Sequence, residues 1–151
     1  MSPSDLSNQV ITQVGIVVRD IEATAAAYAD VFGVPVPGIS VTAPKEDSHV
    51  RYRGGETDAR AKLAFFRLGQ VSIELIEPVG EPSTWAEHLA AHGEGVHHIA
   101  FRVEGMDETI AYLEGKGLEL VQRGDFTGGC YAYLDGSGPL KVILELLAST
   151  K

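Results

Sequence analysis

Four residues of the sequence combine metal-binding side-chain types with positions that repeat along the chain. Gln13 and His98 each stand in a short apolar segment, and Glu74 and Glu145 each stand between apolar residues in a later one. Because alternate side chains of a strand share a face, each polar group is expected to project among apolar neighbours. Two carboxylates in such surroundings are costly unless a positive charge lies between them. Amide, carboxylate and imidazole groups are all metal ligands, so the pattern predicts one divalent cation held by the four side chains.

The same four residues divide the chain into two similar halves. A strand-like segment, a helix-like segment and a closing strand with one carboxylate occur over residues 10–77 and again over residues 95–148. Gln13 to Glu74 spans 61 positions and His98 to Glu145 spans 47, so the second copy is 14 residues shorter, and we assign the loss to a loop. The chain therefore reads as one module written twice within a single domain, residues 10–148.

Hydropathy patterns place the elements that must position these residues. Asp20 can cap the first helix and Gly33 can end it. A capping box beginning at Thr84 predicts a linker helix within residues 83–92. The stretch 41–60 has a weak signal and predicts a strand or two around a loop. The order of strand, helix and further strands occurs twice, and strands do not alternate regularly with helices as they do in a parallel sheet. This order predicts an α+β fold. The predicted strands are 10–18, 61–68, 71–76, 98–103, 118–123, 131–134 and 142–147, and the predicted helices are 21–32, 84–92 and 106–115.

Composition limits the partners of the protein. The chain of 151 residues has a formal net charge of -9, which argues against nucleic acid and against an anionic membrane surface. Cys130 is the single cysteine, so no disulfide is expected; a packing role is favoured over a nucleophile, and the cytoplasm is the expected location. The sequence contains no apolar run of about 18 residues, and residues 1–9 are polar, so we expect neither a membrane span nor a signal peptide.

Two segments carry a resemblance to a known family. Glu94-Gly95-Val96-His97-His98-Ile99-Ala100-Phe101 and Ile73-Glu74-Leu75-Ile76-Glu77-Pro78 are similar to segments of the vicinal oxygen chelate superfamily, also called the glyoxalase fold, and most similar to its methylmalonyl-CoA epimerase-like members. The resemblance covers residues 11–147. It implies two βαβββ modules paired into one cup-shaped mixed sheet around one metal ion. The family's metal positions fall on Gln13, Glu74, His98 and Glu145, and the ion would be Zn, Co, Ni or Mn.

The resemblance also implies an activity. It points to a metal-dependent isomerase or epimerase that shifts a proton beside a carbonyl through a metal-bound enediolate, with Glu145 and Glu74 as candidate catalytic bases. Gln13 is similar to the zinc-using glyoxalase I branch, so a lyase of the lactoylglutathione lyase type is an alternative. A non-catalytic small-molecule-binding protein of the same fold is a third hypothesis, which the retention of all four donors disfavours.

The substrate is predicted to be a small anionic molecule. Arg51, Arg53 and Arg60 concentrate positive charge against the net charge of -9, and we assign them to binding a carboxylate or a phosphate-bearing carrier. The least regular stretches, 39–60 and 125–141, are expected to surround the opening of the cup, because specificity usually resides in loops over a rigid scaffold. We expect the protein to act as a homodimer.

The remaining histidines have less specific interpretations. His97 is next to His98 on a predicted strand, so it is expected to point away from the cup. His88 and His92 lie four residues apart on one helix face, a spacing that can bind metal. The linker helix supplies no third ligand, so a solvated face is the favoured interpretation.

Overall fold

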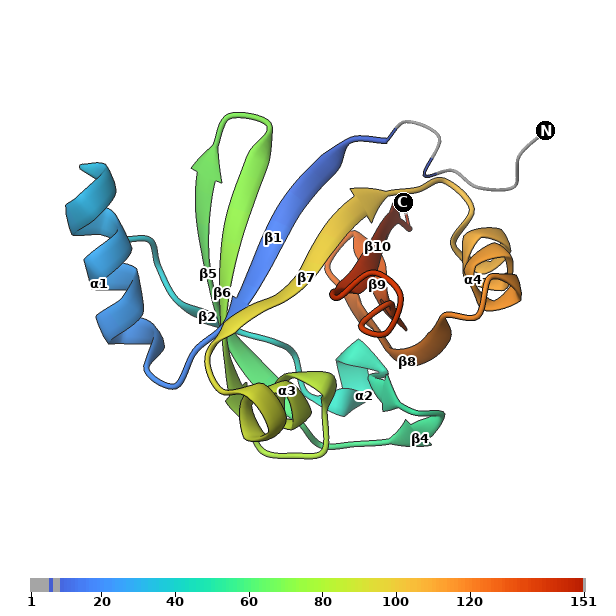
Figure 1. Ribbon diagram of the computed structural model, residues 1–151. Coiled ribbons are helices and arrows are strands. Elements are labelled where there is room, and N and C mark those ends of the chain that lie inside the picture. The colour runs from blue at the N-terminus through green and yellow to red at the C-terminus, as the bar shows by residue number, and fades with distance from the viewer. Residues whose placement is uncertain (1–5, 7–8, 151) are drawn as a thin grey trace.

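The strands of the protein join into one mixed sheet that curls into a half-barrel (Figure 1). The computed structural model describes residue 6 and residues 9–150. The strands of this described part are β1 (Ile11–Val17), β2 (Ser40–Val41), β3 (Arg51–Tyr52), β4 (Gly55–Glu56), β5 (Arg60–Leu68), β6 (Val71–Val79), β7 (Gly95–Arg102), β8 (Glu119–Phe126), β9 (Gly129–Asp135) and β10 (Ile143–Ser149). The helices are α1 (Ile21–Phe32), α2 (Lys45–Ser48), α3 (Thr84–His92) and α4 (Met106–Gly115).

The predicted pairing of two modules is confirmed. Across the sheet the strands run in the order β2-β5-β6-β1-β7-β10-β9-β8-β3-β4. The first strands of the two modules, β1 and β7, pair antiparallel at the centre. Each also pairs in parallel with the last strand of its own module, β6 or β10. The two central strands and their two parallel partners therefore carry the four predicted metal ligands on adjacent strands.

The extra residues of the first module form an arm that crosses to the second. Between β2 and β5 the chain makes α2, β3 and β4, and β3 pairs antiparallel with β8 at the far edge of the sheet. The weak signal of residues 41–60 thus corresponds to short strands around a short helix. In the second module the strands begin or end up to three residues away from the predicted bounds; β7, for example, begins at Gly95 rather than at His98.

The helix ends follow ordinary capping chemistry, with one correction. The Asp20 side chain accepts from the Ala23 N–H, and Gly33 ends α1 at a φ of 68°. For α3 the capping residue is Ser83, not Thr84, because Ser83 has an extended backbone and its side chain accepts from the Ala86 N–H. The Thr84 hydroxyl is consequently left without this role.

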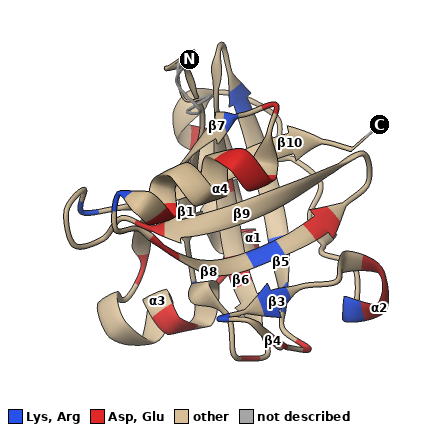
Figure 2. Ribbon diagram, turned by 90° about the vertical axis from the view of Figure 1, so that its right-hand side faces the viewer, with Lys and Arg blue, Asp and Glu red and all other residues tan. Residues whose placement is uncertain are grey.

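Two helices, α1 and α4, cover the outer face of the sheet, whereas α3 packs Trp85 with Val17 and Tyr133 on the inner face. Figure 1 shows α1 beside the first module, α4 beside the second and α3 near the ends of the central strands. Ile21, Ala25 and Ala29 of α1 pack with Leu75 of β6, while the buried residues of α4 pack with β9 and β10. Figure 2 shows acidic segments on α3 and α4 and basic segments on β3 and α2.

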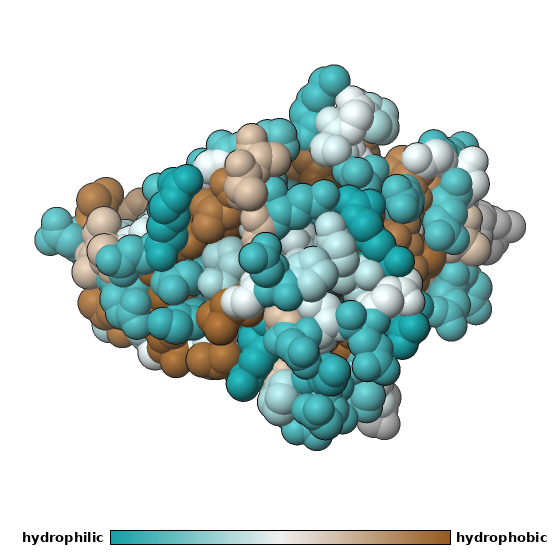
Figure 3. Space-filling model, turned by 90° about the horizontal axis from the view of Figure 1, so that it is seen from below, coloured by the Kyte–Doolittle hydropathy of each residue, from teal (hydrophilic) through white to brown (hydrophobic). Residues whose placement is uncertain are grey.

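The surface of the molecule is mainly hydrophilic in the view of Figure 3, where hydrophobic residues gather toward the end that carries α1. Val31 and Phe32 at the end of α1 are 76% and 44% exposed. Among the described residues no helix combines the length and the apolar character that crossing a membrane requires.

Candidate metal centre

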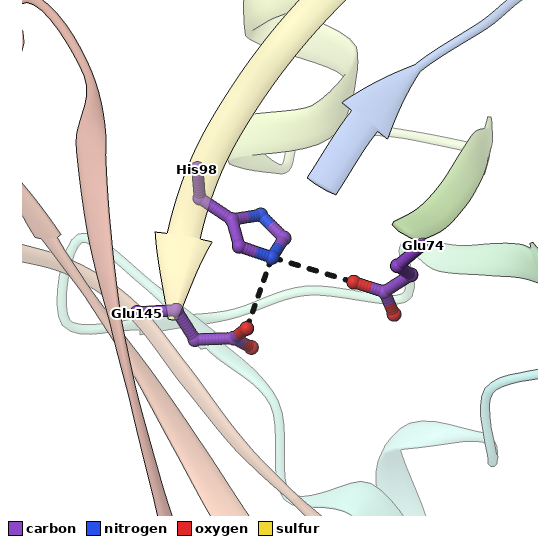
Figure 4. Close-up of side chains that lie close together, drawn as sticks. All are labelled: Glu74, His98 and Glu145. Carbon is purple, nitrogen blue, oxygen red and sulfur yellow. Dashed lines mark ion pairs between the residues drawn. The ribbon is translucent and has the colours of Figure 1, made fainter. Parts of the chain in front are cut away.

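The four predicted ligands converge on one point of the inner face. His98 Nε2 lies 3.0 Å from Glu145 Oε1, 3.4 Å from Glu74 Oε1 and 2.9 Å from Gln13 Oε1. Figure 4 shows that both carboxylates approach the same nitrogen of the His98 ring, Glu74 from β6 and Glu145 from β10. His98 is fully buried, and Glu74 and Glu145 are 7% and 5% exposed. We call Gln13, Glu74, His98 and Glu145 the ligand cluster.

Strand register explains why the ligand cluster assembles. Gly15 of β1 is opposite Glu74 on one side and opposite His98 on the other, so the three residues lie in one row across the sheet. Gln13 is two residues along β1 on the same face. The His98 ring lies over Gly15, because a Cβ atom placed on Gly15 would be 2.0 Å from the ring's Cε1. Gly15 therefore leaves the space through which His98 reaches the other donors.

Replacing Gly15 with Ala is expected to displace the His98 ring and weaken metal binding by at least tenfold. The new methyl group overlaps a fully buried side chain, and overpacking of this kind typically costs about 1–3 kcal/mol of folding free energy. A shift of that size at a ligand also removes the nitrogen donor from its place. Isothermal titration with Zn²⁺ and thermal unfolding of the metal-free protein measure the two effects.

Gly38→Ala is the matched control for this substitution, because a Cβ atom at Gly38 meets no atom within 4 Å. That variant should bind Zn²⁺ like the wild type. An unchanged zinc affinity in Gly15→Ala would show that His98 is not held over Gly15.

The donor set fits a divalent cation. Glu74, His98 and Glu145 place ligand atoms within 4.8 Å of one another. In the structure the Gln13 carbonyl oxygen faces acceptor atoms, an arrangement that a shared cation stabilises. A half-turn of the amide would instead direct its nitrogen to Glu145 Oε1 at 2.8 Å and Glu74 Oε1 at 3.1 Å. One amide can thus complete the cluster with or without a metal ion, and two carboxylates balance the charge of one divalent ion.

The pKa shifts within the ligand cluster also indicate that a positive charge belongs between the two carboxylates. Burial raises the pKa of Glu74, and the nearby Glu145 raises it further, while His98 lowers it. Burial alone would lower the pKa of His98, but the two carboxylates outweigh burial and raise that pKa to about 10. The carboxylates therefore require a positive charge between them, which either a protonated imidazole or a metal ion provides.

The ligand cluster opens on a cavity of about 780 Å³, here called the main cavity. Its size is in the range of small-molecule sites. Gln13, Glu74 and Glu145 form part of its wall. Both irregular stretches that were expected around the opening contribute, residues 39–60 with Thr42 and residues 125–141 with Phe126 among others.

The structure places the three predicted substrate-binding arginines outside the main cavity wall. The Arg51 guanidinium donates to the Gly54 carbonyl at 2.8 Å. The Arg53 guanidinium pairs with Glu87 of α3 at 3.0 Å. Arg60 donates to the Thr42 carbonyl at 2.8 Å, behind the wall. None of the three is among the described residues that line the main cavity.

Arg67 and Arg102 are instead the basic side chains of the described cavity wall. The alternation of the strands contains the signal for both. Arg102 is four residues after His98 on β7 and so shares its face, and Arg67 is opposite Ser72, two residues from Glu74, on the neighbouring strand. The clustering of basic residues along the chain predicted Arg51 and Arg53 as substrate-binding residues. The alternation of side chains along the strands instead predicts Arg67 and Arg102.

Comparison with known proteins gives a family. The model of the Glyoxalase/Bleomycin resistance protein/Dioxygenase superfamily matches residues 12–133. An ethylmalonyl-CoA/methylmalonyl-CoA epimerase of Cereibacter sphaeroides is 30% identical over 116 residues, which cover 76% of this chain and 76% of that protein. The protein YqjC of Bacillus subtilis is 35% identical over 66 residues, which cover 44% of this chain and 47% of that protein. The chain thus matches about half the length of YqjC.

Solved structures agree with this family. The methylmalonyl-CoA epimerase of Mycobacterium tuberculosis has a TM-score of 0.68 at 21% identity, with 100% of this chain and 93% of that chain covered, and this likeness concerns the fold. A variant of Streptomyces coelicolor methylmalonyl-CoA epimerase in complex with 2-nitronate-propionyl-CoA has a TM-score of 0.65 at 27% identity, with 93% and 97% covered. The family match extends over most of the sequence and agrees with the paired modules. The chain belongs to the Glyoxalase/Bleomycin resistance protein/Dioxygenase superfamily.

Proposed function

We propose that the protein is a metal-dependent epimerase or isomerase that moves a proton on the carbon beside the carbonyl of an acyl-CoA thioester. The observation that carries the proposal is the convergence of the four donors of the ligand cluster on the wall of the main cavity. Relatives named as methylmalonyl-CoA epimerases, in sequence and in structure, support the same reaction class.

The ligand cluster would hold one divalent ion, with Zn, Co, Ni and Mn as the candidates. Such an ion supplies Lewis-acid polarisation of a carbonyl oxygen, which makes the neighbouring C–H bond more acidic. The protein's own contribution is to fix four donors on adjacent strands, with Glu74, His98 and Glu145 buried and Gln13 partly exposed. His98 is the single nitrogen donor, and its strand β7 pairs with β1 of the first module and with β10 of the second.

Glu74 and Glu145 are the proposed proton carriers. One comes from the first module and the other from the second, and each contacts His98 Nε2 (Figure 4). The proposal places the substrate carbon between them. Epimerisation removes a proton from one face of a carbon and returns a proton to the other face. A carboxylate on each side can accept the first proton and, as a carboxylic acid, donate the second. The carbon is left with the opposite configuration and no net change in protons.

The main cavity also suits an anionic substrate. Arg67 and Arg102 bring two positive charges to its wall, although the protein as a whole has a net charge of -9. Asp125 is also on the wall, and its carboxylate pairs with His49 at 2.9 Å. The two arginines therefore offer a local attraction for a carboxylate or for the phosphates of a carrier such as coenzyme A.

Neutralising Arg67 and Arg102 together, as Arg67→Gln with Arg102→Gln, is expected to raise KM for an acyl-CoA substrate roughly 2- to 30-fold, the range that two exposed ion pairs provide. The value of kcat should change little, because the charges bind the substrate equally well before and during the reaction. The salt dependence of KM should also weaken. Steady-state kinetics at low and high ionic strength measure both quantities.

The matched comparison is the double variant Arg51→Gln with Arg53→Gln, which tests the prediction made from the sequence. Because these side chains lie outside the main cavity wall, we expect its KM to stay near the wild-type value. A larger rise in KM for this pair than for Arg67 and Arg102 would reverse the assignment.

The proposed function is tested by metal analysis followed by solvent exchange. Protein purified without added metal is analysed for bound ions, and then incubated in D₂O with acyl-CoA thioesters and with hemithioacetals. Deuterium incorporation beside the thioester carbonyl, dependent on the bound ion, is the expected result. Turnover of hemithioacetals alone would favour the glyoxalase I-like lyase. Gln13 is the residue of the ligand cluster that supports this alternative. Binding without exchange of either class would favour a non-catalytic binding protein.

The expected homodimer is part of the proposal and is tested separately. Sedimentation velocity on the purified protein should give the mass of two chains. A single-chain mass would remove the dimer from the proposal and leave the ligand cluster unaffected, because one chain supplies all four donors.

A further inference from the structure

A second histidine contacts the metal ligand directly. His97 Nδ1 lies 2.9 Å from His98 Nδ1, and the rings meet nearly edge to face, with centroids 5.2 Å apart. Both side chains are buried, at 1% and 0% exposure. His97 contributes nothing to the wall of the main cavity and instead borders a second cavity of about 390 Å³. The contact therefore joins the ligand cluster to the second cavity.

A bulge in β7 makes this contact possible. Gly15 is opposite His98, but the next residue of β1, Ile16, is opposite Val96, so His97 is the extra residue on β7. Neighbouring residues of a regular strand point to opposite faces, which would separate the two rings. A bulge suspends that alternation and can redirect a side chain beside a functional site.

Hydrogen-bond accounting fixes the direction of the bond. The two nitrogens are close enough to share one proton, so one donates and the other accepts. His98 must present the lone pair of Nε2 to a metal ion, because that nitrogen faces the other three donors. Neutral His98 then carries its proton on Nδ1, and His97 Nδ1 is the acceptor. His97 in turn carries its own proton on Nε2.

The surroundings of His97 hold its ring in this position. The ring packs against Tyr133 and His88, with centroids 5.0 Å and 5.4 Å away, and Trp85 donates to the Tyr133 hydroxyl at 3.0 Å. His97 Nε2 and Thr84 Oγ1 are buried and have no hydrogen-bond partner among the described protein groups, and both residues border the second cavity. That cavity has polar groups on its wall and is large enough for a water molecule to accept from the Nε2–H.

We propose that His97 is a positioning residue of the metal centre, whose Nδ1 accepts the Nδ1–H of His98 and so holds His98 in the tautomer that offers Nε2 to the ion. The inference deepens the proposed function, since it concerns the same ligand cluster. Outer partners of this kind orient the ligand and increase its basicity, and their loss typically costs 10- to 100-fold in metal affinity.

The direct test is nitrogen NMR on the wild-type protein. Long-range proton–nitrogen spectra of ¹⁵N-labelled, Zn²⁺-loaded protein report which ring nitrogen carries each proton. The expected result is His98 protonated on Nδ1 and His97 protonated on Nε2. Zinc bound to a protein whose His97 is protonated on Nδ1 would overturn this inference and leave the proposed function intact. Failure of the wild-type protein to bind zinc would overturn the proposed function itself.

Variants test the energetic consequence. His97→Phe keeps a buried ring but removes the acceptor, and zinc affinity, measured by competition with a chelator, should fall 10- to 100-fold. His97→Asn places an amide oxygen near the position of Nδ1 and should restore much of that loss. His88→Phe is the matched control, because His88 borders the same cavity and packs on His97 without touching the ligand cluster.

The pattern across the three variants decides the outcome. A loss in His97→Phe with recovery in His97→Asn supports the positioning role, because a role in packing alone would favour the larger ring of Phe. Wild-type affinity in all three overturns the role. If His97→Phe does not fold, the tautomers observed in the wild-type spectra decide whether His97 has the positioning role.

Discussion

Replacing Glu145 with Gln is expected to slow solvent exchange at the substrate carbon by roughly 10²- to 10⁴-fold, the contribution typical of a general acid or base. Gln has nearly the same shape as Glu and keeps one oxygen as a possible ligand, but it cannot accept a proton. The side chain is buried on β10 between apolar residues, so the fold should remain. Deuterium incorporation into a thioester substrate, followed by mass spectrometry, measures the effect.

Glu74→Gln is the matched variant, because Glu74 approaches the same centre from the first module. If the two carboxylates serve opposite faces of the carbon, each variant should lose exchange with one enantiomer of the substrate more than with the other. Both should lose epimerisation. Metal content is measured in each preparation, so that a loss of proton transfer is separated from a loss of the ion.

Full exchange activity in Glu145→Gln with its metal retained would remove Glu145 from proton transfer. Full activity in both variants would place the proton carrier elsewhere. Asp125 is the remaining carboxylate on the described wall of the main cavity, and it would then be the next residue to replace.

The ligand cluster could be predicted because it depends on local patterns. A polar residue at a fixed place in an apolar strand is visible in the sequence, and two such strands per module gave the repeat. The parity of each strand then determined the face of Gln13, Glu74, His98 and Glu145. The structure adds that the four strands are neighbours, which follows from the module pairing that the resemblance implied.

The arm over residues 42–59 could not be predicted in the same way. Its pairing partner β8 is more than sixty residues away along the chain, and two-residue strands carry almost no pattern. The position of the arm decides which arginines reach the main cavity. Arg51 on β3 lies near the far edge of the sheet, while Arg67 and Arg102 are on the long strands β5 and β7.

The positioning role proposed for His97 could not be predicted from the sequence either. Strand parity predicts that His97 points to the face opposite His98. The bulge instead brings its ring beside His98 and against Tyr133, which is on the wall of the main cavity, although His97 itself is not. Bulges depend on the register between two strands, here set by Gly15 and Ile16 of β1. In the sequence, the adjacent histidines His97 and His98 and the glycine Gly15 are the visible parts of this arrangement.

Replacing His98 with Ala is expected to abolish specific metal binding. His98 is the single nitrogen donor of the ligand cluster and the residue that both carboxylates contact. Its loss should lower zinc affinity by more than the roughly 10- to 100-fold typical of an outer partner. Titration with Zn²⁺ in the presence of a competing chelator measures the affinity.

The metal-free variant should also be less stable than the metal-free wild type. Breaking a buried ion pair by removing one partner typically costs about 3–5 kcal/mol, because the remaining charge has no partner. Protonation of one carboxyl group relieves part of that cost, so we expect the lower end, about 3 kcal/mol. For a domain of this length such a change corresponds to a fall in Tm of roughly 6–12 °C.

His92→Ala is the control, because His92 is exposed on α3 and makes no contact with the ligand cluster among the described residues. It should keep both the zinc affinity and the Tm of the wild type. Zinc affinity retained in His98→Ala would place the ion outside the ligand cluster. Because the proposed roles of Glu74, Glu145 and His97 all depend on an ion bound at His98, that single result would remove the basis for each of them.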